Sequence, residues 1–195
     1  MKITVFYDYI CPFCYLTATR LDALSREFDL EIDWKGVEIH PEFPPQGKKL
    51  SKSIKSLKRV AIIKDTALEE GEGVKLPGFV TNSRLSLEAS EFAKTMNRFR
   101  EFHHGIYEAY FVKGQNIGDM NIILQVGEKA SLEKTALEEC LKNRTMYDRI
   151  EENKKEAGKN SVLGVPTLFL ERFPVHGNQS LETLRKLIRR AIEKS

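Results

Sequence analysis

The chain of 195 residues has little cysteine, a single tryptophan and no long apolar run. Three cysteines are too few, and odd in number, for a secreted fold held together by disulfides. No segment approaches the roughly 18–20 consecutive apolar residues that a membrane-spanning helix needs. The first residues, Met1 to Asp8, contain one lysine and a short apolar stretch, too little for a secretory signal peptide. We therefore expect a cytoplasmic protein with no membrane partner.

Charge of one sign is also scarce. The formal net charge is +3, because 31 basic residues are interleaved with 28 acidic ones. A nucleic-acid-binding protein normally gathers its basic residues on one face, so we expect no nucleic-acid partner. Hydrophobic residues make up 41% of the chain, an ordinary share for a globular protein with a core. The composition leaves monomer and homodimer equally open.

The two ends of the chain have strand character, whereas the middle is helical. Strand formers are concentrated in residues 2–9, 31–39, 167–170 and 174–176. Apolar residues at three- and four-residue spacing predict helices at 12–28, 50–70, 85–96, 99–110, 120–129, 132–141, 145–157 and 181–192, with Asp119, Ser131 and Ser180 as N-caps. This order predicts an α/β domain built from residues 1–45 and 160–195, with an all-helical insertion at 46–159.

The motif Cys11-Pro12-Phe13-Cys14 lies where the first strand gives way to the first helix. A helix N-terminus offers unpaired backbone N–H groups and a positive dipole end, and both stabilise a thiolate. Cys11 would be exposed there, with its pKa lowered from about 8.5 to roughly 3.5–7. Cys14, one helical turn further on, would be more buried and close enough to form a disulfide. We predict that Cys11 attacks a substrate disulfide and that Cys14 resolves the mixed disulfide.

A metal site is the main alternative use of this pair. Structural zinc needs four ligands, but Cys140 stands alone within a helical stripe. The histidines His40, His103, His104 and His176 show no matching ligand spacing, so we expect no metal. Cys140 is expected to be a buried, inert thiol. Of His103 and His104, one should face solvent and the other fill space, with a place in a substrate groove as the alternative.

A second motif, Gly164-Val165-Pro166-Thr167, precedes the late apolar strand. Proline at the start of a core strand is often preceded by a cis peptide bond, although Pro166 alone fits a trans bond equally well. In thioredoxin-type sites a cis-proline packs beside the cysteine pair, which makes the cis form the better prediction here. Val165 would then pair with the backbone of an extended substrate, and Pro12, Phe13 and Thr167 would complete the substrate-binding surface.

These motifs resemble the DsbA family of thiol–disulfide oxidoreductases, and most closely its FrnE-like branch. The active-site signature is similar to Asp8-Tyr9-Ile10-Cys11-Pro12-Phe13-Cys14-Tyr15. Later landmarks of the branch resemble residues 82–84, 107–111, 116–119, 164–167 and 175–179, in the same order. The resemblance spans nearly the whole chain. It implies a thioredoxin-like fold with a large helical insertion, a redox-active disulfide between Cys11 and Cys14, and a cis-proline at Pro166.

The sequence departs from that family pattern at two places. Phe13 replaces the usual tryptophan between the cysteines, which leaves the reduction potential and the direction of exchange open. Val5 stands where many members of the wider superfamily carry a buried carboxylate for proton transfer. Asp8 or Glu38 could take over that role, although either is more often a solvated or capping carboxylate.

The resemblance implies partners that carry thiols or disulfides, on proteins or peptides, and glutathione is a candidate redox partner. No tightly bound cofactor is expected. A second class remains open: the glutathione-dependent 2-hydroxychromene-2-carboxylate isomerases and kappa-class glutathione transferases resemble this architecture too. Those enzymes typically use one serine or cysteine at the helix start, so retention of both Cys11 and Cys14 favours disulfide exchange.

Overall fold

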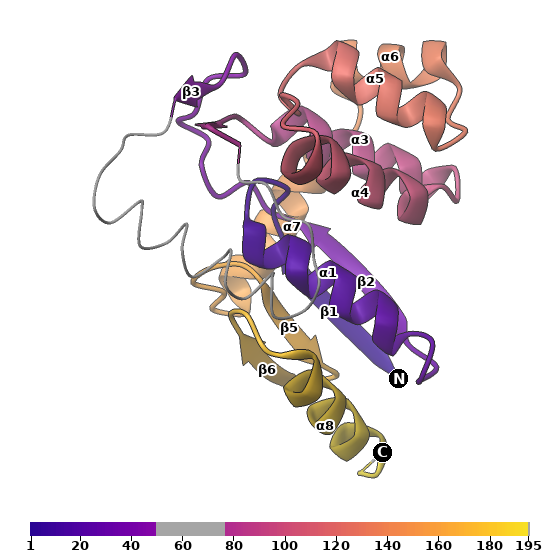
Figure 1. Cartoon of the computed structure of the whole chain (residues 1–195), viewed down its shortest axis with the longest axis vertical. Coiled ribbons are helices and arrows are strands. Elements are labelled where there is room, and N and C mark those ends of the chain that lie inside the picture. The colour runs from indigo at the N-terminus through magenta and orange to yellow at the C-terminus, as the bar shows by residue number, and fades with distance from the viewer. Residues whose placement is uncertain (50–76, 195) are drawn as a thin grey trace.

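The computed structural model describes residues 1–49 and 77–194. A four-stranded mixed sheet in the order β2-β1-β5-β6 combines both ends of the chain (Figure 1). Its strands are β1 (Lys2–Tyr7), β2 (Glu31–Gly36), β5 (Thr167–Leu170) and β6 (Phe173–His176). β1 pairs with β2 in parallel and with β5 antiparallel. The prediction of a thioredoxin-like α/β fold with a helical insertion is confirmed, whereas the domain boundaries stay a prediction.

The central position of β1 follows from its side chains. Ile3 and Val5 are fully buried, and Val5 lies opposite Trp34 of β2 and Leu168 of β5. β-Branched and aromatic residues suit a strand that is covered on both faces. The first two strands end at Tyr7 and Gly36, earlier than their sequence patterns predict, because the chain then leaves the sheet toward the cysteine motif and toward Ile39.

Helices cover both faces of this sheet. α1 (Pro12–Leu24) and α8 (Leu181–Ile192) contact each other on the near face in Figure 1, and α7 (Tyr147–Lys159) packs against β2 on the far face. Ser180 caps α8 as predicted, its hydroxyl accepting the Thr183 N–H. Arg20, buried in α1, donates to Asn178 and Gln179 just before α8, which ties the two ends of the chain together.

The remaining helices form a block at the upper end of the molecule (Figure 1). They are α3 (Arg84–Thr95), α4 (Phe99–Tyr107), the π-helical turn η1 (Glu108–Val112), α5 (Met120–Lys129) and α6 (Lys134–Lys142). A short pair, β3 (Lys48–Lys49) with β4 (Phe79–Val80), lies beside them. The helix predicted for 50–70 lies outside the described residues.

The two N-caps predicted within this block have different outcomes. Asp119 caps α5, because its carboxylate accepts the Asn121 N–H at 2.9 Å. The prediction of Ser131 as the next cap is wrong. Ser131 has a φ of 61° and ends the preceding helix, and the carboxylate of Glu133 accepts the backbone N–H groups that open α6. Because α5 and α6 are so close in the sequence, one residue ends α5 and a different residue caps the start of α6.

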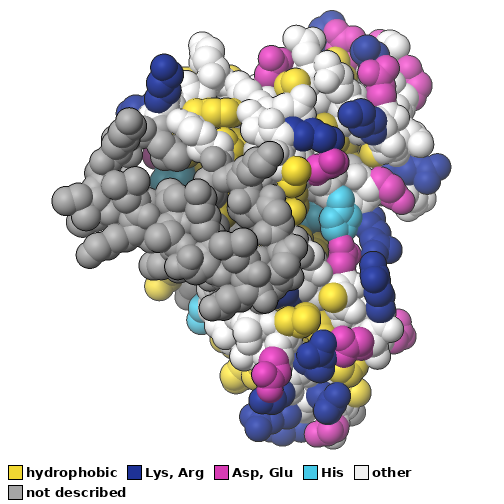
Figure 2. Space-filling view, viewed as in Figure 1, with side chains coloured by type: hydrophobic (Ala, Val, Ile, Leu, Met, Phe, Trp, Pro, Cys, Tyr) yellow, Lys and Arg dark blue, Asp and Glu magenta, His cyan; other side chains and the backbone are white. Residues whose placement is uncertain are grey.

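Basic and acidic side chains are interspersed over the described part of the face drawn in Figure 2. In the described part of the chain, no helix combines the length and the apolar character that crossing a membrane requires.

Candidate active site

The cysteine motif forms a tight turn at the end of β1. The Cys11 N–H donates to the Asp8 carbonyl at 3.2 Å, and Cys11 becomes the N-cap of α1. Pro12 occupies the first turn of the helix, where a missing N–H costs nothing. The Cys14 N–H then donates to the Cys11 carbonyl at 3.0 Å. The motif therefore stands at the helix start, as its sequence predicts.

The two thiols differ in acidity. The Cys14 thiol donates to the Cys11 sulfur and lowers the pKa of Cys11, and the backbone N–H groups of Cys14 and Phe13 act in the same direction against burial. Burial, followed by the hydrogen bond to Cys11 and the charge on it, raises the pKa of Cys14 well above its ordinary value. Cys11 is therefore the more acidic thiol of the pair, and the surroundings of Cys14 favour its protonated form.

Both cysteines are buried, and Cys11 is less exposed than its sequence predicts. Cys11 is only 7% exposed and Cys14 1%, so the prediction of an exposed Cys11 is wrong while the deeper position of Cys14 is right. The cause is the loop before β5. The Cys11 Sγ lies 3.5 Å from the Val165 carbonyl oxygen, 154 residues along the chain, and this contact covers the thiol.

The Val165–Pro166 peptide bond in that loop is cis. The Pro166 carbonyl accepts the N–H of Gly177, which has a φ of 71° favourable to glycine. The Thr167 hydroxyl donates to the Gly164 carbonyl at 2.7 Å. Thr167 is buried and used locally, whereas Val165, Pro12 and Phe13 remain partly exposed. The structure thus brings the cysteine motif and the loop of Val165 and Pro166 together, with Thr167 supporting the loop rather than facing outward.

Asp8 is a fully buried carboxylate on the cysteine turn. Its two oxygens accept the backbone N–H groups of Ile39 at 2.8 Å and Ile10 at 3.3 Å. Burial raises the pKa of Asp8 from 3.8 to about 6, against the lowering effect of those N–H groups and the Ser83 hydroxyl. Its charge in turn raises the pKa of both thiols.

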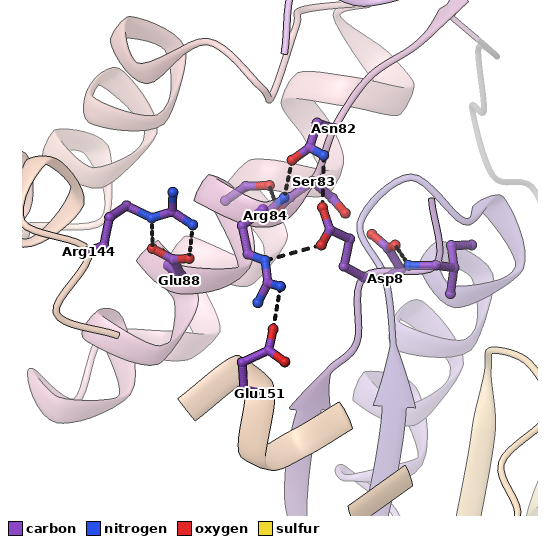
Figure 3. Close-up of polar contacts among 10 residues, drawn as sticks. Asp8, Asn82, Ser83, Arg84, Glu88, Arg144 and Glu151 are labelled. Atoms are coloured by element: carbon purple, nitrogen blue, oxygen red, sulfur yellow. Dashed lines mark hydrogen bonds and ion pairs between the residues drawn. The ribbon is translucent and has the colours of Figure 1, made fainter. Parts of the chain in front are cut away.

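Glu38 is the second carboxylate that the sequence offered as a candidate, and its hydrogen-bond partners are side chains rather than backbone N–H groups. Its oxygens accept from Asn82 at 2.8 Å and from the Arg84 Nε at 3.1 Å, and Arg84 also pairs with Glu151 (Figure 3). This network joins the chain after β2 to α3 and α7. Glu38 is therefore a structural ion-pair residue, and Asp8 is the carboxylate that faces the thiols.

Sequence reasoning missed an aromatic cover over the cysteine turn. Tyr107 of α4 packs against Tyr9 and Tyr15, with ring centroids 5.0 and 5.5 Å apart. His103, one turn earlier, is buried, and its Nδ1 lies 3.1 Å from the Tyr9 hydroxyl. Burial lowers the pKa of His103 far below its ordinary value, so it stays neutral. The sequence predicted that one of His103 and His104 would be buried, and the structure identifies it as His103. The 107–111 segment was the signal in the sequence for this aromatic cover.

A cleft of about 610 Å³ lies between α1 and helices α4 and α5. It begins at Tyr15 and runs along α1 to Arg26, and the partly exposed His104 lines it beside Asp22. Neither cysteine lines this cleft. Over residues 1–49 and 77–194, no group of three or more His, Cys, Asp and Glu side chains is arranged to hold a metal ion.

Related proteins align in sequence with nearly the whole chain. The chain is 26% identical over 191 residues to the uncharacterized protein YwbO of Bacillus subtilis, covering 96% of each chain. It is 21% identical over 196 residues to a 2-hydroxychromene-2-carboxylate isomerase of Pseudomonas putida, covering 97% of this chain and 95% of the other.

Solved structures agree with this fold. The probable DsbA oxidoreductase SCO1869 of Streptomyces coelicolor superposes with a TM-score of 0.88 at 19% identity, over 100% of this chain and 91% of the other. The cytosolic disulfide reductase DsbM of Pseudomonas aeruginosa, in a structure with GSH, gives 0.73 at 16% identity over 97% and 100%. The DSBA-like thioredoxin domain model matches residues 2–189, and the chain therefore belongs to the DSBA-like thioredoxin domain family.

Proposed function

We propose that this protein catalyses thiol–disulfide exchange through Cys11 and Cys14, on protein or peptide substrates. The observation that carries the proposal is a pair of hydrogen-bonded thiols at the start of a helix, whose pKa values are shifted in opposite directions. The pKa of Cys11 is lowered and that of Cys14 is raised. A dithiol of this kind attacks with one sulfur and keeps the other protonated until it is needed.

In the reducing direction, the Cys11 thiolate attacks one sulfur of a substrate disulfide. A bond forms between Cys11 and that sulfur, and the other substrate sulfur leaves as a thiolate. Cys14 then loses its proton and attacks the Cys11 sulfur. The Cys11–Cys14 bond forms, and the second substrate thiolate leaves and takes up a proton. The protein dithiol is oxidised by two electrons and the substrate disulfide is reduced; the reverse sequence oxidises a substrate dithiol.

The loop containing Val165 and Pro166 supports the binding of an extended substrate. The Val165 carbonyl already accepts from the Cys11 thiol, so a substrate segment joined to Cys11 would pass beside this backbone. Val165, Pro12 and Phe13 are partly exposed around the thiol and would contact the flanking residues. Glutathione is a candidate redox partner, because the structurally similar DsbM is a disulfide reductase whose structure contains GSH.

The experiment is a redox titration. Purified protein is equilibrated in glutathione buffers of defined potential, acid-quenched, and its free thiols are alkylated and counted by mass. We expect a reversible two-electron transition from three free thiols to one, with Cys140 remaining free. A midpoint near about −270 mV would indicate a reductase, and one near about −120 mV an oxidase. Absence of any transition would overturn the proposal.

A glutathione-dependent isomerase is the second candidate, favoured by the similarity to 2-hydroxychromene-2-carboxylate isomerases across nearly the whole chain. The variant Cys14→Ala separates the two functions. An isomerase that needs one sulfur at the helix start keeps its glutathione-dependent turnover of 2-hydroxychromene-2-carboxylate in this variant. A disulfide exchanger loses multiple turnover and accumulates a mixed disulfide on Cys11.

A further inference from the structure

Tyr107 brings a hydroxyl group from the helical block to the cysteine turn. Its ring is fully buried and packs against Tyr9 and Tyr15. These two residues flank the Cys11–Cys14 motif in the sequence, one on each side. A ring that contacts both of them lies directly against the turn, so Tyr107 reaches the redox pair from α4, more than 90 residues away in the chain.

The hydroxyl group of Tyr107 is the unusual feature. Among the described residues it is buried and has no hydrogen-bond partner. The hydroxyl groups of the other buried tyrosines all have a partner. The Tyr7 hydroxyl is hydrogen-bonded to Ser90 and the Tyr9 hydroxyl to His103, and the Tyr110 hydroxyl donates to the Phe79 carbonyl. A buried donor without a partner is costly, and a group that appears later in a reaction can supply the missing acceptor.

Cys14 belongs to the turn between Tyr9 and Tyr15, and the Tyr107 ring contacts both of those residues. After burial, the charge of Cys14 is the strongest influence that raises the pKa of the Tyr107 phenol, ahead of Tyr7, Tyr9 and Cys11. The phenol therefore stays protonated and remains a donor. Cys14 itself is faced by one backbone donor, the Asp8 N–H, and by two groups that oppose its ionisation, the Cys11 sulfur and the Asp8 carboxylate.

We propose that the Tyr107 hydroxyl donates a hydrogen bond to the Cys14 sulfur as that sulfur becomes negative, and so speeds resolution of the mixed disulfide. The proposal rests on the disulfide-exchange function above. In the step concerned, Cys14 loses its proton and its sulfur bonds to Cys11. The bond between Cys11 and the substrate breaks, and the substrate leaves as a thiolate that is then protonated. Tyr107 keeps its own proton throughout.

The test uses 5,5′-dithiobis(2-nitrobenzoate) as the disulfide substrate in stopped flow. Reduced protein releases one thionitrobenzoate when Cys11 attacks and a second when Cys14 resolves, so the two steps are separate phases. In Tyr107→Phe the ring stays and the hydroxyl goes. A hydrogen bond to a charged sulfur corresponds to about one to two pKa units. Because a less acidic thiol is also a better nucleophile, we expect the second phase to slow roughly 3- to 10-fold.

The first phase should change less than about twofold, and the melting temperature of the reduced variant should equal or exceed that of the wild type, because an unpartnered hydroxyl has been removed. Tyr110→Phe is the matched control. It lies one turn further on, is equally buried and loses a hydroxyl that has a partner, so it should lower the melting temperature and leave the second phase unchanged.

The outcomes separate this inference from the function on which it rests. Wild-type protein without a second phase would overturn the disulfide-exchange function. A normal wild-type second phase that is unchanged in Tyr107→Phe would overturn only the role of the hydroxyl. Equal slowing in Tyr107→Phe and Tyr110→Phe would also overturn it, because a general loss of packing would then explain both.

Discussion

Two regions of the molecule each place a buried thiol near a buried carboxylate, but the groups around the two thiols differ. In the helical block, burial raises the pKa of Cys140, and the charge of the fully buried Glu88 adds to this effect. Every group there has a partner. Arg144 donates to both Glu88 oxygens, at 2.7 and 2.6 Å (Figure 3). The Thr145 hydroxyl donates to the Cys140 sulfur at 3.0 Å.

At the start of α1 the corresponding carboxylate has no cation. Asp8 is held only by backbone N–H groups and a nearby hydroxyl, and no Lys, Arg or His of the described residues forms an ion pair with it. Burial acts to raise the pKa of Asp8 and of all three thiols, and Cys11 is the one thiol whose pKa is nevertheless lowered. The comparison indicates that the hydrogen-bond donors around a buried thiol, as well as its burial, set the direction of its pKa shift.

The largest expected effect comes from the cysteines of the motif. Cys11→Ser should reduce disulfide exchange to the uncatalysed background, because the only thiol with a lowered pKa is gone. Cys14→Ser should attack a peptide disulfide at a near-normal rate and stop as a mixed disulfide on Cys11. Mass spectrometry of the trapped species checks both. A stable adduct on Cys140 in either variant would show that the two regions are less different than their surroundings indicate.

The variant Asp8→Asn tests the consequence of burying the Asp8 carboxylate without a cation beside it. The pKa of Asp8 is about 6 in the folded protein against 3.8 ordinarily, so its ionisation opposes folding. This penalty is small at pH 4, develops as the pH rises from the unfolded pKa to the folded pKa, and is complete above the folded pKa. The difference in unfolding free energy between Asp8→Asn and wild type should therefore grow in favour of the variant by about 2.4 kcal/mol between pH 4 and pH 7.

Urea unfolding of the reduced proteins at several pH values measures this difference. A difference that stays constant with pH would mean that Asp8 is not the titrating group. The rate of attack by Cys11 gives a second measurement. The Asp8 charge raises the pKa of Cys11, so its removal in Asp8→Asn should lower that pKa and make attack by Cys11 faster near neutral pH.

Arg144→Met tests the opposite arrangement in the helical block. It leaves the Glu88 carboxylate buried without its cation. Loss of one partner of a fully buried pair costs about 3–5 kcal/mol, and because Arg144 is 43% exposed on its side chain we expect about 2 kcal/mol. Denaturant unfolding checks the value. Disulfide exchange at Cys11 should be unchanged in the folded variant, and a matching loss of exchange would link the two regions.

How much of this could be read from the sequence depends on the distance along the chain between interacting groups. The Cys11–Cys14 spacing, the proline at the helix start and the Asp119 and Ser180 caps are local patterns, and the structure agrees with each. The prediction of a cis bond before Pro166 required one non-local step, namely pairing this motif with the cysteine motif at the other end of the chain. The Val165–Pro166 bond is cis, as predicted.

Other features depend on contacts that no local pattern encodes. Tyr107 belongs to an ordinary apolar stripe of a helix, and only packing brings it to Tyr9 and Tyr15. The low exposure of Cys11 arises from the Val165 carbonyl, 154 residues away. Asp8 and Glu38 were equal candidates in the sequence. The structure distinguishes them, because Arg84 binds Glu38 whereas the charge of Asp8 acts on the two thiols.

The smallest expected effect belongs to Cys140→Ser. Oxygen replaces sulfur at a position where the Thr145 hydroxyl still finds an acceptor, so the unfolding free energy should change by only about 1 kcal/mol. Both phases of thionitrobenzoate release should stay within about twofold of wild type, because Cys140 lies in α6, away from the turn. The same variant sharpens the thiol count, since oxidation should then take it from two free thiols to none. A tenfold loss of exchange would mean that Cys140 participates in the reaction, and the contrast between the two buried thiols would fail.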